Sequence, residues 1–441
     1  MRFRASRCDS LQRGAFFPAC PAGAPVAGRP IACRAYSRGS RPVRRRGMRC
    51  NGGNRRFSGR RTGCGVENGP AFARPCATPN ANMKKTTQNL LLCAAATCGG
   101  TLQAVACTGI SLTAKDGSYV QGRTIEWASG PLRSEYVVIP RGERLCSYTP
   151  MGSDGLCFTA KYGVVGLSVV RKEFIAEGIN EAGLSAGLFF FPRYGGYEPY
   201  DPGQNGRTLA DLQVVQWMLT QFATIDEVRE AIASVRVVGL ERTSVVHWRI
   251  GERSGRQAVL EIVDGEPRFF ENPVGVLTNA PGFEWQLTNL NNYVNLYPGT
   301  APDRDLGGFT LRPTGGNSGF LGLPGDATPP SRFVRAAFYR ATAPQRATAF
   351  DAVLQCFHLL NNFDIPVGIE HPEGETPNIP SATQWTSVID LTHGKVYYKT
   401  AYDNSIRCID LHTVDFSKVR YAARPLDEVQ RQPVVEVTIP Q

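Results

Sequence analysis

The pattern of hydrophobic and polar positions predicts strands and helices in separate blocks along residues 107–441. Short runs of β-branched and aromatic residues, bounded by Asp-Gly and other Gly-containing turns, are typical of strands. We expect strands at Thr108–Thr113, Tyr119–Trp127, Tyr136–Pro140, Val164–Val170, Leu184–Phe191, Ser244–Ile250, Gln257–Val263, Arg268–Phe270, Thr386–Asp390, Lys395–Thr400 and Ser405–Leu411. Helical spacing of hydrophobic residues predicts helices at Leu209–Phe222, Ile225–Val235, Arg332–Ala341 and Thr348–Asn361. Such blocks, without an internal repeat, indicate one α+β domain.

Two local signals add detail to this prediction. The sequence Thr224–Glu227 is a capping box and marks the start of the second helix. The Gly- and Pro-rich stretch Pro298–Pro330 predicts a long connection, and long connections in compact domains often carry function.

Residues 1–82 show no sustained hydrophobic period, so we expect this segment to be disordered. The segment contains 17 Arg and no Lys, with only Asp9 and Glu67 as acidic residues, a net charge of +15. The rest of the chain carries a net charge of −4, so the total of +11 does not indicate a nucleic-acid partner for the folded part. We favour a spurious upstream extension of the reading frame over a targeting or nucleic-acid-binding segment.

Residues 83–106 have the pattern of a signal peptide. Lys84 and Lys85 follow Met83, Leu90–Ala96 is a short apolar run, and Ala104–Ala106 has the small residues of a signal-peptidase site. The apolar run is shorter than the roughly 20 residues that span a bilayer, and no later segment is long enough. We therefore expect cleavage between Ala106 and Cys107, a periplasmic or secreted protein, and no stable membrane span.

The cysteines are consistent with export. Eight of the 13 cysteines precede Cys107, which leaves Cys107, Cys146, Cys157, Cys356 and Cys408. Five is an odd number, so at least one thiol stays unpaired in an oxidising compartment. Cys146 and Cys157 are close enough in sequence to form a disulfide, but the sequence does not decide whether they do.

Several common chemistries lack their motifs. The histidines show no metal-ligand spacing, there is no nucleotide-binding glycine motif, and we expect no metal and no organic cofactor. Gly183–Gly187 matches the G-x-S-x-G pattern of a nucleophile elbow around Ser185. That elbow needs a strand, a sharp turn and a helix. Here Ser185 lies inside a predicted strand, so we do not interpret it as a nucleophile.

Cys107 has the stronger chemical signal. Cleavage after Ala106 would give one residue both a thiol and a free α-amine, whose ordinary pKa of about 7.7–8.0 lets it accept the thiol proton near neutral pH. Nucleophile and base would then belong to a single residue. Two other interpretations remain, a structural cysteine near the cleavage site and a lipoprotein cysteine whose amine is acylated for anchoring.

From Cys107 onward the chain resembles the choloylglycine hydrolase family, which includes bile salt hydrolases and penicillin V acylases. Five motifs occur in the family's order over essentially all of 107–441. They are CTG at Cys107–Gly109, GRTIEW at Gly122–Trp127, GINEAGLSAGL at Gly178–Leu188, GVLTNAPGFEW at Gly275–Trp285 and GLPGDATPPSRFVRAAF at Gly322–Phe338. The resemblance implies a four-layer αββα sandwich and an N-terminal-nucleophile hydrolase that cleaves linear amides.

The resemblance also implies roles for single residues. Cys107 aligns with the nucleophile and Arg123 with the Arg beside the thiol. Glu126 stands where the family usually has Asp, a carboxylate thought to hold the α-amine, so its extra methylene changes that geometry. Asn279 aligns with the oxyanion-hole Asn and Arg332 with a second Arg near the attacked carbonyl. Arg335, further along the same helix, is predicted to be a surface or salt-bridge residue.

One departure from the family concerns specificity. Many bile salt hydrolases have GLNFP where this chain has Gly187–Pro192, with one extra residue and Phe189 at the Asn position. Relatives without that Asn use the backbone N–H there, so we expect Phe189 to supply a backbone oxyanion donor. Trp127, Phe190 and Phe191 suggest an aromatic acyl pocket, although such residues also build cores.

The expected partner is a small N-acyl amide: a conjugated bile salt, penicillin V or an acyl-homoserine lactone. An inactive lipid-anchored binding protein is the alternative from another class. The resemblance also suggests a homotetramer.

Overall fold

The computed structural model describes residues 106–127, 132–240, 245–367, 369 and 382–440. The predicted disordered segment 1–82 and the predicted signal peptide, apart from Ala106, lie outside these ranges. Among the described residues, none of the helices has both the length and the apolar character needed to cross a bilayer.

The first of two large sheets is six-stranded and antiparallel throughout, in the order β14–β1–β2–β17–β18–β19. Its strands are β14 (Val276–Leu277), β1 (Cys107–Thr113), β2 (Tyr119–Trp127), β17 (Ala382–Asp390), β18 (Lys395–Thr400) and β19 (Arg407–Asp410). The strands β1, β2 and β17 are almost entirely buried because both faces of this sheet are covered. This explains why their sequences are continuous hydrophobic and small-residue runs rather than strict alternations.

The second sheet is eight-stranded and also antiparallel, in the order β13–β12–β11–β8–β7–β6–β3–β20. Its strands are β13 (Glu266–Glu271), β12 (Gln257–Val263), β11 (Val246–Glu252), β8 (Leu184–Phe190), β7 (Arg171–Asn180), β6 (Val164–Val169), β3 (Ser134–Ile139) and β20 (Ala422–Pro425). Smaller pairs are β4 (Arg144–Cys146) with β5 (Cys157–Thr159), β9 (Thr208–Ala210) with β10 (Arg236–Val238), and β15 (Arg304–Leu306) with β16 (Phe309–Leu311).

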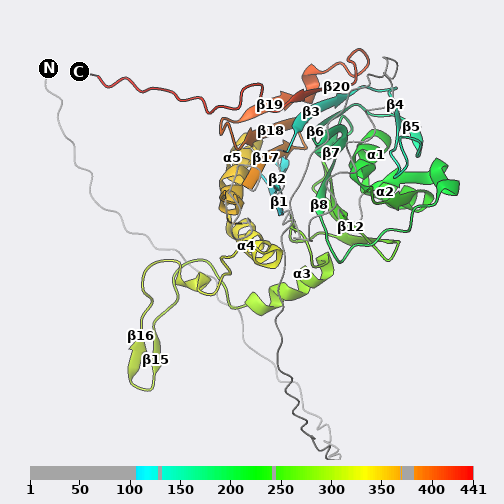
Figure 1. Ribbon diagram of the computed structural model, residues 1–441. Helices are drawn as coiled ribbons and strands as arrows, with labels where there is room; N and C mark the ends of the chain where they lie inside the picture. Colours follow the sequence, from blue (N-terminus) through cyan, green and yellow to red (C-terminus); the bar gives the residue numbers. More distant parts are fainter. Residues whose placement is uncertain (1–105, 128–131, 241–244, 368, 370–381, 441) are drawn as a thin grey trace, which may run out of the picture. The chain divides into compact units, whose positions relative to one another are not determined.

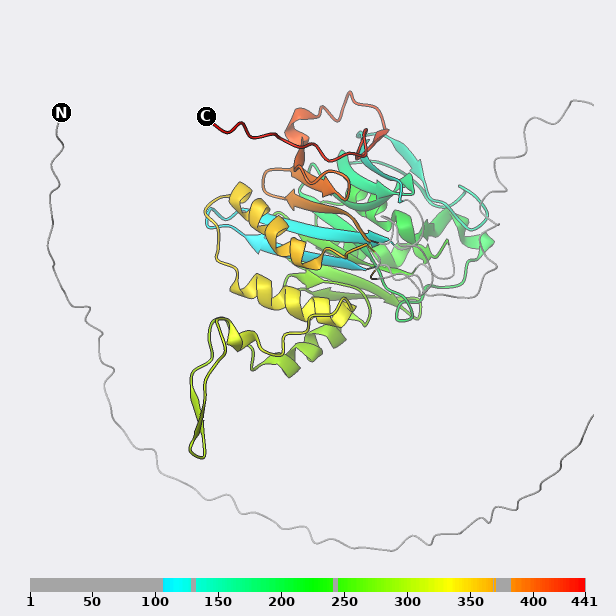
Figure 2. The same ribbon diagram turned by 60° about the vertical axis from the view of Figure 1, so that its left-hand side comes forward.

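Helices cover the outer face of each sheet, so the layers run helix, sheet, sheet, helix (Figure 1). In the residues that the structure describes, the α-helices are α1 (Val214–Gln221), α2 (Ile225–Ala231), α3 (Phe283–Asn289), α4 (Pro329–Thr342) and α5 (Ala349–Leu360). Short 3-10 helices lie at Pro202–Arg207, Asp211–Gln213, Ile232–Ser234, Leu290–Tyr293, Ser318–Phe320, Asn361–Phe363 and Leu411–Thr413. Figure 2 shows α4 and α5 lying across β1 and β2. The expected four-layer α+β sandwich is therefore confirmed.

Glycines let the layers approach closely at two points. A Cβ added at Gly122 of β2 would lie 2.6 Å from the Cys356 sulfur of α5. A Cβ added at Gly109 of β1 would lie 2.8 Å from the Phe189 ring, which belongs to the other sheet. The narrow spacing between the sheets at Gly109 brings β8 next to the start of β1, where Cys107 lies.

Most predicted elements are confirmed, and the exceptions have local causes. The strands Tyr119–Trp127, Gln257–Val263 and Lys395–Thr400 have the predicted bounds, and Thr224 and Glu227 form both hydrogen bonds of the capping box. The helix predicted to begin at Leu209 begins at Val214, because residues 208–210 instead form a parallel strand pair with β10. The strand β7 and the helix α3 were not predicted.

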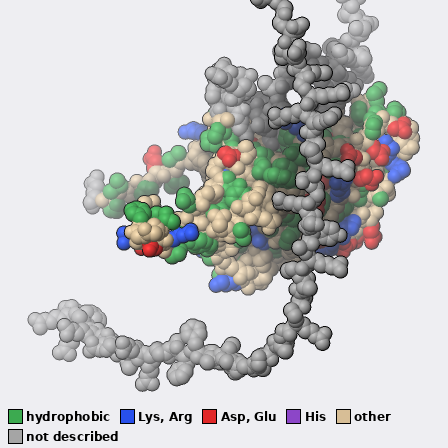
Figure 3. Space-filling model, turned by 90° about the horizontal axis from the view of Figure 1, so that it is seen from below, with side chains coloured by type: hydrophobic (Ala, Val, Ile, Leu, Met, Phe, Trp, Pro, Cys, Tyr) green, Lys and Arg blue, Asp and Glu red, His purple; other side chains and the backbone are tan. Residues whose placement is uncertain are grey.

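The long connection before α4 contains a projecting hairpin, β15–β16 (Figures 1 and 2). Its hydrophobic side chains Leu306 and Phe309 are 62% and 68% exposed. Figure 3 views the molecule from the side on which this hairpin lies and shows hydrophobic side chains beside charged ones on that surface.

Cys146 and Cys157 face each other across the β4–β5 pair and form a disulfide. Cys107 and Cys356 are buried free thiols, and Cys408 is an exposed free thiol. The structure thus answers the pairing question that the sequence left open.

Candidate active site

Cys107 is the first residue of β1 and is buried at 2% exposure. Its backbone N–H donates a hydrogen bond to Asn279 Oδ1 (2.9 Å). Its carbonyl oxygen accepts a hydrogen bond from Arg332 Nη1 (2.5 Å). Both backbone groups of the candidate nucleophile are therefore held by side chains that the sequence singled out.

Arg332 and Asn279 also bind each other. Arg332 lies in the N-terminal part of α4 and donates through Nη2 to Asn279 Oδ1 (2.7 Å) and through Nη1 to Thr108 Oγ1 (2.8 Å). Its Nε donates to the Ala327 carbonyl (2.8 Å). Asn279 Nδ2 donates to the Phe190 carbonyl (2.8 Å). Asn279 thus connects β1, β8 and α4 around Cys107.

Arg123 of β2 reaches from one sheet into the other. Its Nη1 donates to the carbonyl oxygens of Leu188 (2.6 Å) and Ala176 (3.0 Å), and its guanidinium lies 4.3 Å from the centre of the Phe189 ring. Within the described part of the chain, Arg123 Nη2 has no hydrogen-bond partner. Arg123 therefore combines a structural role between the sheets with one spare N–H donor.

The pKa of the Cys107 thiol is raised above its ordinary value, chiefly by burial. The positive charge of Arg123 lowers this pKa, the Glu126 carboxylate raises it, and the charge of Arg332 lowers it. A hydrogen bond from the backbone N–H of Phe190 also favours the thiolate. Two guanidinium groups and one backbone donor thus oppose the cost of burying a thiolate.

Glu126 lies beside the bond that precedes Cys107. It is 1% exposed, and its backbone N–H donates to the Ala106 carbonyl (3.0 Å). Its Oε1 accepts a hydrogen bond from Thr383 Oγ1 (3.0 Å). The Glu126 carboxylate is therefore held next to the predicted cleavage position, in the region where the α-amine of a processed Cys107 would form.

The register of β8 determines which backbone N–H faces Cys107. Phe191 N–H donates to the Val245 carbonyl (2.7 Å) toward β11, and N–H groups alternate in direction along a strand. The Phe189 N–H therefore faces β11, whereas the N–H facing Cys107 belongs to Phe190. The N–H that faces Cys107 is therefore one residue after Phe189, the residue expected to supply it, because the register with β11 sets which N–H groups face inward.

The structure also corrects part of the predicted aromatic pocket. Phe191 is fully buried and stacks on the His247 ring, with centroids 4.4 Å apart, so it belongs to the core. Phe190 and Trp127 are partly exposed, at the ends of β8 and β2. Ser185 is buried inside β8, which confirms that it lies in a strand rather than at an elbow.

Arg335 differs from its predicted surface or salt-bridge role. It is 9% exposed and donates through Nη1 to the carbonyls of Pro324 (2.8 Å) and Asp326 (2.9 Å). It therefore holds the chain that leads into α4 rather than an ionic partner on the surface.

Three buried polar residues near the site were missed by the sequence reasoning. Glu177 of β7 and Arg249 of β11 form an ion pair (2.8 Å) across Gly187 of β8, within the second sheet. The His247 ring nitrogens lie 3.1 Å from Glu261 Oε1 and 3.1 Å from the carbonyl of Thr278, the residue before Asn279. A charged residue at the centre of an apolar strand was the available signal, because such a charge needs a buried partner.

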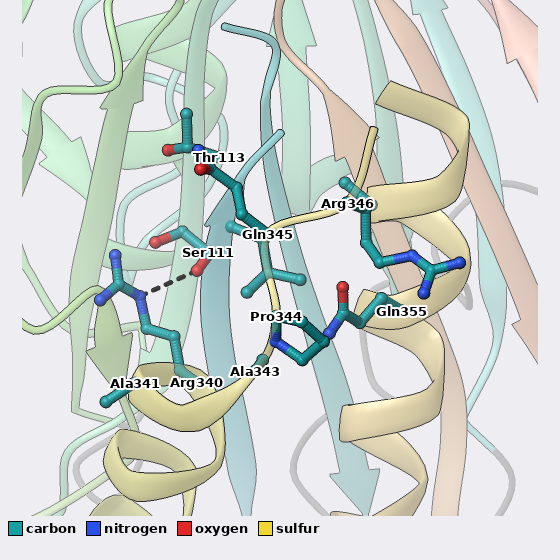
Figure 4. Close-up of a pocket in the computed structure, with 11 residues that line it drawn as sticks. Ser111, Thr113, Arg340, Ala341, Ala343, Pro344, Gln345, Arg346 and Gln355 are labelled. Atoms are coloured by element: carbon teal, nitrogen blue, oxygen red, sulfur yellow. Dashed lines mark hydrogen bonds between the residues drawn. The ribbon is translucent and has the colours of Figure 1, made fainter. Parts of the chain in front are cut away.

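A separate cavity of about 210 Å³ lies at the other end of β1 (Figure 4). It is lined by Ser111–Thr113 and by residues around the α4–α5 connection, where Arg340 donates to the Ser111 carbonyl (2.9 Å). The predicted site residues do not line this cavity. In the part of the chain that the structure describes, no three His, Cys, Asp or Glu side chains gather as a metal site.

The fold and the site define a class. Two stacked antiparallel sheets between helix layers, with a cysteine at the first residue of a central strand, form the architecture of N-terminal-nucleophile hydrolases. Residues 107–421 match the family of linear amide C-N hydrolases, choloylglycine hydrolase family. The chain belongs to this family of amidohydrolases.

Individual relatives support this assignment. A bile salt hydrolase/transferase of Clostridium perfringens is 32% identical over 314 residues, which cover 69% of this chain and 92% of the relative. A solved structure of a conjugated bile acid hydrolase variant from Clostridium perfringens has a TM-score of 0.66 at 29% identity, covering 75% of this chain and 100% of that chain. Penicillin V acylase from Agrobacterium tumefaciens has a TM-score of 0.58 at 25% identity, covering 73% and 91%.

Proposed function

We propose that the protein hydrolyses the amide bond of conjugated bile salts, with Cys107 as the nucleophile. The observation that carries the proposal is the arrangement around Cys107, whose N–H meets Asn279 and whose carbonyl meets Arg332. The match to the family begins at this residue. The identity to a bile salt hydrolase/transferase, 32%, favours a bile salt over other linear amides as the substrate.

The proposed reaction needs no group beyond the chain and water. The Cys107 thiolate attacks the amide carbonyl carbon, and the α-ammonium donates its proton to the leaving nitrogen as the C–N bond breaks. Water then attacks the thioester carbon, which releases the free acid and returns the thiol. The backbone N–H of Phe190 and the Asn279 side chain are the candidate donors to the oxyanion.

The mechanism requires a free amine on Cys107, so we propose cleavage between Ala106 and Cys107 and export of the mature chain to the periplasm or beyond. The Cys146–Cys157 disulfide supports an oxidising compartment. Ala106 has a small side chain that suits a signal peptidase. Mass spectrometry of the mature N-terminus tests this step. A free Cys107 agrees with the proposal, whereas an acylated Cys107 would make the protein an inactive lipid-anchored relative.

Penicillin V and acyl-homoserine lactones are the alternative substrates. Partly exposed Phe190 and Trp127 next to the site favour an apolar, aromatic acyl group.

We also propose self-association, as the family resemblance suggests, and the exposed Leu306 and Phe309 of the β15–β16 hairpin support it. Mass measurement by light scattering tests it, and a monomer at assay concentration would contradict it.

The substrate is tested by amine release from glycocholate, taurocholate, penicillin V and a long-chain acyl-homoserine lactone. The protein used must begin at Cys107. Release of glycine or taurine is the expected result. Turnover of penicillin V or the lactone alone would overturn the bile salt assignment while leaving the amidohydrolase in place.

A further inference from the structure

Three charged side chains lie together between the two sheets, and two of them, Glu177 and Arg249, are outside the predicted site. Arg123, Glu177 and Arg249 are each at most 1% exposed. Arg249 Nη2 donates to Glu177 Oε1 at 2.8 Å, and Arg123 Nη1 lies 3.8 Å from Glu177 Oε2. The Phe189 ring contacts both guanidinium groups, at 4.3 Å and 5.6 Å from its centre. Burying three charges costs free energy unless each charge is paired and hydrogen-bonded in its buried position.

The Arg123 guanidinium takes the place of one pair of backbone hydrogen bonds between β7 and β8 in the second sheet. The pairing of β7 with β8 ends at Glu177 opposite Gly187. The next two carbonyl groups, of Ala176 and Leu188, both accept hydrogen bonds from Arg123 Nη1. The guanidinium therefore lies where the two strands would otherwise continue their ladder.

This interruption leaves the end of β8 available to the site. Beyond Leu188, β8 still pairs with β11 but no longer with β7. The Phe190 N–H then faces the Cys107 sulfur, and the Phe190 carbonyl accepts from Asn279 Nδ2. The position of Arg123 thus decides where this backbone donor lies.

By pairing with Glu177, Arg249 prevents the Glu177 carboxylate from pulling Arg123 off the carbonyls of Ala176 and Leu188. The shorter contact of Glu177 is to Arg249, at 2.8 Å, which leaves Arg123 Nη1 on the two carbonyls. Arg249 is itself held by the carbonyls of Ile110 (3.2 Å) and Gly122 (3.0 Å) of the first sheet. Through these hydrogen bonds of Arg249, the pair fixes the position of the two sheets relative to each other.

We propose that Glu177 and Arg249 are positioning residues for catalysis: they hold Arg123 between β7 and β8, and so hold the Phe190 N–H on Cys107. The proposal rests on the proposed role of Cys107 as the nucleophile. It extends that role to two residues that do not touch the reacting atoms.

The charges around Cys107 and Arg123 determine the sign of the expected pH effect. The charged groups that act on Cys107 are Arg123 and Glu126 from β2 and Arg332 from α4. Those near Arg123 are Glu177 from β7 and Arg249 from β11. The His247 ring, which contacts Glu261, packs against the Phe189 ring with centroids 6.2 Å apart. Glu177 and Arg249 are not among the charged groups that act on Cys107, so replacing either one affects the thiol through the positions of Arg123 and the Phe190 N–H.

The test follows the rate of Cys107 alkylation by iodoacetamide against pH, in the full mature protein beginning at Cys107. Peptide mass mapping separates Cys107 from Cys356 and Cys408. We expect Glu177→Gln and Arg249→Gln each to raise the midpoint by about half a pH unit or more, because each displaces Arg123 and the Phe190 N–H, which favour the thiolate. We expect the double variant to have a raised midpoint as well, because the support of Arg123 is still missing.

Turnover is measured on the same proteins. Each single variant should lower kcat about tenfold or more with KM within about threefold, because the loss concerns the reacting geometry. Arg256→Gln is the matched control, since it removes an Arg from an outer ion cluster with Asp226 and Glu271. Its pH midpoint and kcat should equal those of wild type.

Unchanged or lowered midpoints in folded single variants would overturn the proposal. If the single variants fail to fold, the double variant decides, because a folded double variant with the wild-type midpoint contradicts it. Alkylation needs no substrate. A wild-type protein that cleaves none of the amides would therefore refute the proposed function, and the midpoints would still test the positioning roles.

Discussion

Replacing Arg332 by Lys tests the candidate site most sharply, because the substitution keeps the positive charge and removes the planar guanidinium group with its three nitrogens. Arg332 is 1% exposed and makes four hydrogen bonds through three nitrogens, to the Ala327 and Cys107 carbonyls, Thr108 Oγ1 and Asn279 Oδ1. A Lys ammonium donates from a single point and cannot occupy both the Nε and Nη2 positions. At least two of the four hydrogen bonds are therefore lost.

A hydrogen bond from a charged donor contributes about 1.5–3 kcal/mol, so the two losses amount to about 3–6 kcal/mol. If this free energy is expressed in the transition state, kcat/KM falls about 10²- to 10⁴-fold. Any part expressed in the folded state lowers the free energy of unfolding instead. Steady-state kinetics and urea unfolding of the same preparation separate the two contributions.

Arg335→Lys is the matched control for this variant. Arg335 lies on the same helix and is also buried, but its hydrogen bonds go to the Pro324 and Asp326 carbonyls. We expect Arg335→Lys to lower stability while kcat/KM stays within about tenfold of wild type. An Arg332→Lys protein with the wild-type kcat/KM and stability would refute the reasoning that Arg332 holds Cys107 and Asn279 through its geometry.

Three further predictions follow from the contacts. Glu126→Gln removes a charge that raises the pKa of the Cys107 thiol, so the alkylation midpoint should fall, and an unchanged or higher midpoint would contradict this. Replacing Cys146 and Cys157 together by Ser should lower the free energy of unfolding by about 2–3 kcal/mol in urea titrations, because the disulfide closes a short loop. Asp326 accepts hydrogen bonds from Thr328 and Ser331, and its pKa is lowered to about 2. A lowered pKa stabilises the fold above the ordinary value of 3.8, and this stability is lost as pH falls toward 2. The stability difference between wild type and Asp326→Asn should therefore shrink between pH 4 and pH 2, and a constant difference would contradict it.

The strands of the central layers could be predicted because both sheet faces are covered, which leaves long apolar runs in the sequence. The strand β7 could not, because it begins with Arg171 and Lys172 and carries Glu177 at its centre. A charge in that position is typical of a surface, and its partner Arg249 lies 72 residues away in the sequence. The pairing of β7 and β11 with β8, where both residues lie opposite Gly187, brings the pair together.

The sequence could predict which residues belong to the candidate site, but not how their atoms are arranged around Cys107. Motif order brought together Cys107, Arg123, Asn279 and Arg332. The structure joins Cys107, Asn279 and Arg332 by hydrogen bonds, whereas Arg123 acts on the Cys107 thiol through its charge. The choice between Phe189 and Phe190 depends on which N–H groups of β8 are used by β11. That register is a property of the sheet, and a run of three Phe residues contains no signal for it.

The central claim is that the Cys107 thiol attacks the amide carbonyl, and the most direct measurement compares wild type with Cys107→Ser. Both proteins begin at position 107, and the rate of glycine release from glycocholate is followed at equal concentration and equal folded fraction. A hydroxyl is far less acidic than a thiol, so the account predicts a loss of about 10³-fold or more in kcat/KM. A Ser variant that releases glycine at a near wild-type rate would contradict it.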